Sequence, residues 1–228
     1  MYRNNNGVIE DSFQAFLVEG AEFTKTQEEY PIIRKDMVAE TTPIKIMPFN
    51  KAIKFQGDLS KTFIHFYCQD QSFERIRKNP KKYLNFFKRT AGFIGFDYSI
   101  HTDMQMVKQK GQINDNLSHT YYYANQGNLC IPNIRCGVDE LKEEFFEAIP
   151  KNSLVAIGTF GFIKTNYQKA DWFCFIQDII VNLNPSGIIV VGTLPEFIVK
   201  EFENKCPFYF YDSWMVENRK EFYNEGRK

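Results

Sequence analysis

Four polar side chains at alternate positions follow a short apolar run. The run is residues 93–96 (Phe-Ile-Gly-Phe), and the polar side chains are Asp97, Ser99, His101 and Asp103. Carboxylates, a hydroxyl and an imidazole are the groups that general acid–base catalysis uses. A buried strand that ends in clustered polar groups is where parallel α/β proteins place their chemistry. We therefore predict a site here, with Asp97 and His101 catalytic and Ser99 and Asp103 binding a ligand.

Asp97 has two candidate carboxylate partners, Asp70 and Asp212, which follow other predicted strands. A pair of carboxylates can divide acid and base roles, or can hold a hard divalent cation through oxygen. Asp70 is therefore predicted to be catalytic together with Asp97, and a divalent cation is the candidate cofactor. The alternative is structural, because Asp and Ser side chains at such positions accept hydrogen bonds from nearby backbone N–H groups and shape turns.

Histidine has a pKa close to neutral pH, which suits a general base. His101 lies in the polar segment, whereas His65 lies within an apolar run and His119 within a predicted helix. The assisting catalytic role is therefore assigned to His101. An ordinary exposed histidine is the alternative.

Further polar side chains follow the other predicted strands. They are Cys68, Arg135, Thr159, Thr193, Glu196 and Asp212. Gly192-Thr193 lies between a predicted strand and a predicted helix, where backbone N–H groups can face an anion. No P-loop or G-x-G-x-x-G pattern accompanies it, so a dedicated nucleotide site is not predicted. We expect Arg135, Thr193 and Asp212 to bind a ligand, and Cys68 to be a small apolar group rather than a nucleophile.

A regular alternation of strands and helices from residue 61 onward positions these side chains. Near-continuous short apolar runs are typical of strands buried on both faces. The predicted strands are residues 63–67, 93–96, 129–134, 154–157, 188–191 and 208–211. Apolar residues at helical spacing are clearest in residues 172–183 and 141–149. Asn79-Pro80 divides residues 72–89 into two predicted helices, because proline suits the first position of a helix. Pro195 is expected to begin another helix in the same way.

Six strands joined by helical segments predict an α/β fold of repeated βα units with a mainly parallel sheet. The sheet is either open and doubly wound or partly closed into a TIM-like barrel. In either form the carboxyl ends of the strands share one edge, so the polar residues that follow them should converge.

The length suits a single domain, residues 1–228. Residues 1–60, punctuated by prolines, are less regular and are expected to add one or two strands. Residues 61–214 form the βα core, and residues 215–228 are a tail that is a short helix or a frayed end. The core should be rich in aromatic rings, because 23 Phe and 12 Tyr contribute to an aromatic share of 16%.

Charge and cysteine content exclude several classes of protein. The 28 basic and 28 acidic residues cancel, which argues against nucleic acid as the partner. The basic stretch at residues 75–89 is explained by a helix with buried aromatics and solvated lysines. The five cysteines contain no C-x-x-C pair, so neither a disulfide framework nor a zinc site is predicted.

No signal peptide and no apolar run long enough to cross a bilayer is recognised. We therefore expect a cytoplasmic protein without a membrane partner. The identity of its protein partner or small-molecule ligand and its oligomeric state stay open.

Several motifs lie in order along the chain. They are Met47-Pro-Phe-Asn50, His65-Phe-Tyr-Cys-Gln-Asp-Gln-Ser-Phe-Glu74, Asn79-Pro80, Phe96-Asp-Tyr-Ser-Ile-His-Thr-Asp-Met104 and Gln126-Gly-Asn-Leu-Cys-Ile-Pro132. In these motifs the chain resembles an uncharacterised family of bacteria, phages and mobile elements, domain of unknown function 4417, over residues 44–214. Asp97 and Ser99 match the family pattern, whereas Phe96 replaces its Pro and Arg135-Cys136 its Trp. The resemblance implies life in a bacterial host cell that carries a phage or integrated element, and it implies no activity.

Two functions are compatible with these features. The first is a hydrolytic or phosphoryl-handling enzyme with a carboxylate site at the strand ends. The alternative is a non-enzymatic accessory protein that binds a host or phage protein, such as a host-defence inhibitor or an assembly factor. A polar pocket at the strand ends would favour the enzyme, and an exposed apolar patch would favour the accessory protein.

Overall fold

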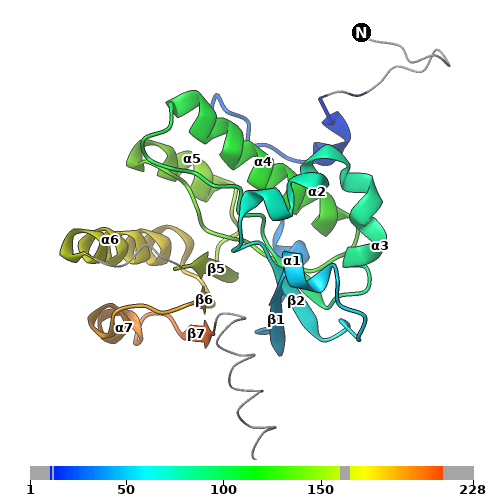
Figure 1. Ribbon diagram of the computed structural model, residues 1–228. Helices are drawn as coiled ribbons and strands as arrows, with labels where there is room; N and C mark the ends of the chain where they lie inside the picture. Colours follow the sequence, from blue (N-terminus) through cyan, green and yellow to red (C-terminus); the bar gives the residue numbers. More distant parts are fainter. Residues whose placement is uncertain (1–10, 12, 160–164, 213–228) are drawn as a thin grey trace, which may run out of the picture.

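The computed structural model describes residues 11, 13–159 and 165–212, which form an alternating α/β architecture with two all-parallel sheets (Figure 1). The strand order is β1-β2-β3-β4 in the first sheet and β5-β6-β7 in the second. The strands are β1 (Lys45–Pro48), β2 (Thr62–His65), β3 (Gly92–Ile94), β4 (Cys130–Ile131), β5 (Leu154–Gly158), β6 (Gly187–Val191) and β7 (Phe208–Tyr211). The predicted fold class is confirmed, and β1 supplies a strand within residues 1–60.

Both sheets run in sequence order without a reversal. This is the strand order of a βα barrel, whereas a doubly wound sheet reverses its order part-way. The last strand approaches the start of the first, because the Tyr211 hydroxyl donates to the carbonyl oxygen of Pro43 at 2.6 Å. The residues that the structure describes nevertheless form two sheets and no closed barrel.

The predicted strand at residues 129–134 pairs with both sheets. Up to Ile131 it pairs with β3, where Ile131 is the partner of Ile94. Beyond this point the N–H of Ile134 donates to the carbonyl oxygen of Ala156 in β5 at 2.8 Å, and the N–H of Ala156 donates to that of Pro132 at 2.8 Å. The segment therefore crosses from one sheet to the other, and it carries the residues after β4 to the junction between them.

The helices pack along the strands. They are α1 (Phe49–Ala52), α2 (Glu74–Lys78), α3 (Leu84–Phe87), α4 (Met106–Asn125), α5 (Lys142–Glu147), α6 (Asn166–Leu183) and α7 (Glu196–Phe202), with 3₁₀ turns at Ala15–Val18, Lys35–Met37, Asp70–Ser72, Pro80–Tyr83 and Asp139–Leu141. Figure 1 shows α6 and α7 side by side along the second sheet, while α1 to α4 gather around the first.

The helix predictions are confirmed in their positions. Pro80 opens the second half of the divided segment, as expected. Pro195 lies one position earlier than expected, as the residue that caps α7. Thr165 caps α6, because its hydroxyl accepts the N–H of Gln168 at 3.2 Å. The predicted tail at residues 215–228 lies outside the described residues.

Aromatic rings fill the core between the first sheet and its helices, as the composition predicts. The rings of Phe66 and Phe96 stack with their centroids 4.0 Å apart, at an interplanar angle of 18°. Phe66 also contacts Phe73, and Phe96 contacts Tyr98 and Tyr123. All five rings are buried. The stack anchors the strand ends after β2 and β3, next to the polar residues that follow them.

Replacing Gly111 with alanine should raise the free energy of unfolding by about 1 kcal/mol, because glycine inside a helix costs backbone entropy. Gly111 lies in α4, is exposed, and an added Cβ would meet nothing within 4 Å. The matched control is Gly95→Ala, whose Cβ would lie 2.8 Å from the backbone nitrogen of Asn133 and should therefore destabilise the fold. Urea denaturation of both variants checks this, and opposite signs are the expected outcome.

Candidate functional site

Side chains from the carboxyl ends of three strands meet at the junction of the two sheets. Tyr67 follows β2, Asp97 follows β3, and Asn133 and Arg135 follow β4. Hydrogen bonds join them, from Tyr67 to Asn133, from Asn133 to Asp97, and from Arg135 to Asp97. We call these four residues the Asp97 cluster. The sequence predicted Asp97 and Arg135 at this edge, but it did not single out Tyr67 or Asn133.

Both carboxylate oxygens of the buried Asp97 accept hydrogen bonds. Oδ1 accepts from Nδ2 of Asn133 at 2.8 Å, and Oδ2 accepts from Nη1 of Arg135 at 2.9 Å. Burial raises the pKa of Asp97 to about 6, although Arg135 and the two hydrogen bonds oppose the rise. A carboxyl group that titrates this close to neutral pH can both donate and accept a proton under physiological conditions.

Asp70 lies beside the cluster, and its oxygens are engaged by Ser99. Oδ2 of Asp70 accepts from the backbone N–H of Ser99 at 3.0 Å, and Oδ1 accepts from the Ser99 hydroxyl at 2.9 Å. The negative charge of Asp70 also contributes to the raised pKa of Asp97. The charge of Asp70 therefore acts on Asp97, as the predicted pair requires. The backbone-shaping contact that was the alternative interpretation for Asp97 and Ser99 is made by Asp70, which accepts the N–H of Ser99, while the Ser99 hydroxyl donates to Asp70.

The other predicted site residues lie elsewhere. His101 and Asp103 are exposed. Thr193 follows β6, where its N–H donates to the hydroxyl of Thr159 at 2.9 Å. Asp212 follows β7, the last strand of the second sheet. The charges that act on the pKa of Asp97 are those of Arg135 and Asp70, so of its two candidate carboxylate partners Asp70 is the one with an observed effect on it.

Polar side chains of α4 hold the segment that carries Asp97, and the sequence interpretation missed them. Asn116 accepts the N–H of Tyr98 at 2.7 Å and donates to its carbonyl oxygen at 3.1 Å. The Thr120 hydroxyl accepts the N–H of Phe96 at 3.1 Å. The side chains that hold the segment are Gln112, Asn116 and Thr120. Their spacing of four residues places them on one face of the helix. This polar stripe was the feature of the sequence that could have indicated that α4 binds a neighbouring segment by hydrogen bonds.

Comparison with known proteins identifies the family. A family model described as a domain of unknown function (DUF4417) matches residues 24–209. The chain belongs to this family. The resemblance found in the sequence motifs is thus confirmed for this DUF4417 protein.

A distant relative comes from a bacteriophage. The gene 1 protein of Mycobacterium phage L5 is 22% identical over 131 residues, which cover 58% of this chain and 57% of the phage protein. The chain therefore matches little more than half the length of that relative. No solved structure matches the DUF4417 protein.

A buried histidine and a half-buried cysteine lie near the cluster in uncharged forms. Burial lowers the pKa of His65 to about 3, and His65 packs against the ring of Tyr67 with centroids 5.4 Å apart. Burial raises the pKa of the Cys68 thiol to about 11, and the charges of Asp97 and Asp70 add to the rise. Cys68 therefore stays a thiol at neutral pH, consistent with the expected apolar role.

The described parts of the DUF4417 protein contain no group of three or more His, Cys, Asp and Glu side chains placed to hold a metal ion. Asp97 and Asp70 accept hydrogen bonds from Arg135, Asn133 and Ser99 instead. Among the same residues, no helix combines the length and the apolar character that crossing a membrane requires.

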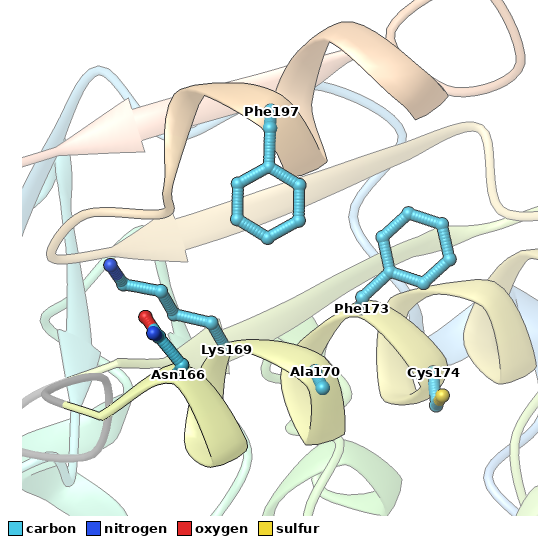
Figure 2. A pocket seen from close by; sticks show the side chains of 6 residues that line it. All are labelled: Asn166, Lys169, Ala170, Phe173, Cys174 and Phe197. Atoms are coloured by element: carbon cyan, nitrogen blue, oxygen red, sulfur yellow. The ribbon is translucent and has the colours of Figure 1, made fainter.

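Two surface cavities lie away from the Asp97 cluster. The first is a groove of about 460 Å³ between α6 and α7. Figure 2 shows Phe173 of α6 and Phe197 of α7 facing each other across it, with Asn166 and Lys169 at one end. The second, of about 390 Å³, lies between the turn at Ala15–Val18 and the end of α4. We call the first cavity the α6–α7 groove; its lining is mainly apolar.

Proposed function

We propose that this DUF4417 protein is a phage or mobile-element enzyme of the hydrolytic or phosphoryl-handling class that acts at the Asp97 cluster. The observation that carries the proposal is a buried carboxyl group, Asp97, that is hydrogen-bonded to Asn133 and Arg135 at the convergence of three strand ends, where burial raises its pKa to about 6. Perturbed carboxyl groups at strand ends are typical of catalytic sites in parallel α/β folds. The distant similarity to a phage protein supports the assignment to a phage or mobile element.

Asp97 acts as the general acid or base in this proposal. Its two hydrogen-bond donors fix the orientation of the carboxyl group, so that a proton is exchanged from one defined position. Arg135, with a fifth of its side chain exposed, is the cation that binds an anionic ester or phosphate group of the substrate. Asp70 supplies the second carboxylate, and its charge adds a small part to the rise in the pKa of Asp97 that burial causes. His101 is exposed in the loop that follows, where it can assist an incoming substrate.

Replacing Asp97 with asparagine should reduce turnover by about 100-fold or more, the usual loss when a general acid or base is removed. The substitution keeps the shape of the side chain but turns an amide NH2 toward one of the two donors, Asn133 or Arg135. The melting temperature should therefore fall, and turnover is compared at a temperature at which both proteins are folded. A panel of chromogenic carboxylic and phosphoric esters measures turnover, and the wild-type rate should bend near the pKa of about 6. Equal rates in the two folded proteins would contradict the proposal.

A second candidate function is favoured by the α6–α7 groove. Helix α6 is apolar on several sides, yet it fully buries only Ile176, Ile179 and Leu183. Phe197 is 49% exposed and stacks on Phe173 with centroids 6.3 Å apart. An exposed apolar groove of this kind suits the side chains of a protein partner. In this alternative the chain is an accessory protein that binds a host or phage protein through the groove.

Replacing Phe197 with serine should weaken binding of such a partner by about 10-fold or more, as for an aromatic residue at the centre of an interface. Val181→Ser is the matched control, because Val181 is 73% exposed on the same helix pair and does not line the groove. Co-purification from the bacterial host followed by mass spectrometry measures the loss. Equal retention of the partner by both variants would contradict the groove as the binding surface.

A further inference from the structure

Within the Asp97 cluster, Tyr67 contacts the end of β5 in the second sheet. It follows β2, and its hydroxyl donates to Oδ1 of Asn133 at 2.9 Å. Its ring lies over Gly158, the last residue of β5, where an added Cβ would meet the ring at 2.4 Å. Only glycine leaves room for the ring at this point. The end of β5 therefore determines where the hydroxyl of Tyr67 can lie.

The side-chain amide of Asn133 can face Asp97 in two ways, because its oxygen and nitrogen have nearly the same shape. In the observed orientation Nδ2 donates to Oδ1 of Asp97 at 2.8 Å and to the carbonyl oxygen of Phe96 at 3.1 Å. The reversed orientation would turn Oδ1 toward these two acceptors, which is repulsive at Asp97 unless it carries a proton and repulsive at the Phe96 carbonyl oxygen in either case. A donor to Oδ1 on the far side of Asn133 selects the observed orientation, and Tyr67 is that donor.

We propose that Tyr67 is a positioning residue of the Asp97 site, which holds the amide of Asn133 with Nδ2 toward Asp97. Tyr67 thereby stabilises the ionised form of Asp97 without donating to it. The inference deepens the proposed function, and it rests on that function only in taking Asp97 as the general acid or base.

Neighbouring groups limit what else could act on Asp97. The charged side chains acting on it are Arg135, after β4, and Asp70, after β2. Cys68 stays a thiol. From α4 the nearby groups are neutral, namely the amide of Asn116 and the hydroxyl of Thr120. A change at Tyr67 should therefore reach Asp97 through Asn133.

The test is a pH titration of the Asp97 carboxyl carbon in the full chain, followed by ¹³C NMR and assigned by its loss in Asp97→Asn. Tyr67→Phe should raise the midpoint from about 6 by about half a pH unit, and Asn133→Ala by about one, because each removes stabilisation of the carboxylate. Tyr30→Phe is the matched control, since Tyr30 is a buried tyrosine whose hydroxyl has no hydrogen-bond partner among the described residues. It should leave the midpoint unchanged.

The double variant Tyr67→Phe with Asn133→Ala decides between positioning and a direct effect. If Tyr67 acts through Asn133, adding Tyr67→Phe to Asn133→Ala should shift the midpoint no further. An equal shift in both backgrounds, or no shift in either, would overturn the proposal.

A second measurement uses the wild-type protein alone, so it does not depend on whether a variant folds. The side-chain amide protons of Asn133 in the wild-type protein should exchange slowly with solvent, because both polar atoms of the amide are hydrogen-bonded. Fast exchange would also overturn the proposal. Neither experiment measures turnover. A protein without enzymatic activity could therefore still give both expected results, so a result that overturns the role of Tyr67 is distinguishable from one that overturns the proposed function.

Discussion

Replacing Arg135 with methionine should lower the free energy of unfolding by about 2–3 kcal/mol near neutral pH, because the buried carboxyl group of Asp97 loses a cationic hydrogen-bond donor and must then take up a proton. Nη1 of Arg135 lies 2.9 Å from Oδ2 of Asp97, and the Asp97 side chain is only 9% exposed. Methionine retains much of the apolar stem of arginine, so the loss arises from the charge rather than from a cavity. Urea denaturation of the variant and the wild type measures it.

The stability deficit of Arg135→Met should depend on pH in a defined direction. The pKa of Asp97 is raised to about 6 in the folded protein, against about 3.9 in an unfolded chain, and loss of Arg135 raises it further. A carboxyl group with a raised folded pKa contributes stability that is full below the unfolded pKa and is lost as pH rises through the folded pKa. Up to about pH 6 both proteins lose this stability alike, so the deficit should be constant below that pH, and it should grow above pH 6, where Asp97 ionises in the wild type but stays protonated in the variant.

The matched control is Arg34→Met. Nε of Arg34 lies 3.1 Å from Oδ1 of Asp36, and the two side chains are 40% and 70% exposed. An exposed ion pair contributes at most about 1 kcal/mol, so this variant should be nearly as stable as the wild type. A similar loss in both variants, or a loss at Arg135 that does not change with pH, would contradict the assignment of a buried ion pair.

Replacing Asn116 with leucine should lower the free energy of unfolding by about 2–4 kcal/mol, because it leaves the buried N–H and carbonyl groups of Tyr98 without partners. Asn116 makes both hydrogen bonds, at 2.7 and 3.1 Å, and Tyr98 is fully buried. The substitution also releases the segment that carries Asp97, so the amide of Tyr98 should exchange with solvent much faster. Urea denaturation and hydrogen exchange measure the two effects.

Asn114→Leu is the control on the same helix. Asn114 is exposed, and its side chain accepts one long hydrogen bond from the Ser118 hydroxyl at 3.4 Å. The change in helix propensity is the same in both variants, so any difference between them reports the hydrogen bonds to Tyr98. If both variants were equally stable, Asn116 would not hold this segment.

The strands and their parallel arrangement could be predicted because they depend on local patterns. Short apolar runs such as residues 154–157 and 188–191 have no alternation, which is typical of strands covered on both faces. Residues 208–211 also form a strand, but the expected burial is wrong there, because β7 lies at the edge of its sheet with Tyr209 and Phe210 exposed. The helical spacing between them requires crossover connections and hence parallel pairing. These features need no knowledge of which side chains meet. For the same reason Asp97 and Arg135 could be assigned to one edge.

The hydrogen-bond partners of Asp97 could not be predicted, because they depend on where each strand ends and which strand the chain pairs with next. Residues 129–134 form one apolar run, but the run leaves β3 after Ile131 and continues along β5. Nothing in the local sequence determines this crossing. It is the crossing that brings Asn133 and Arg135 to Asp97, while the chain after Ser99 turns outward and leaves His101 and Asp103 in solvent.

The sequence by itself thus determined the α/β class, the family and the edge at which polar residues gather, since these follow from local hydrophobic periodicity and from motifs. The tertiary structure alone decided which of those residues form a buried cluster. In the tertiary structure Asp97 accepts hydrogen bonds from Arg135 and Asn133. Asp70 accepts hydrogen bonds from Ser99, and the ring of Tyr67 lies over Gly158. The physical reason is that burial and hydrogen-bond partners arise from the meeting of two sheets and α4, which are far apart in the chain.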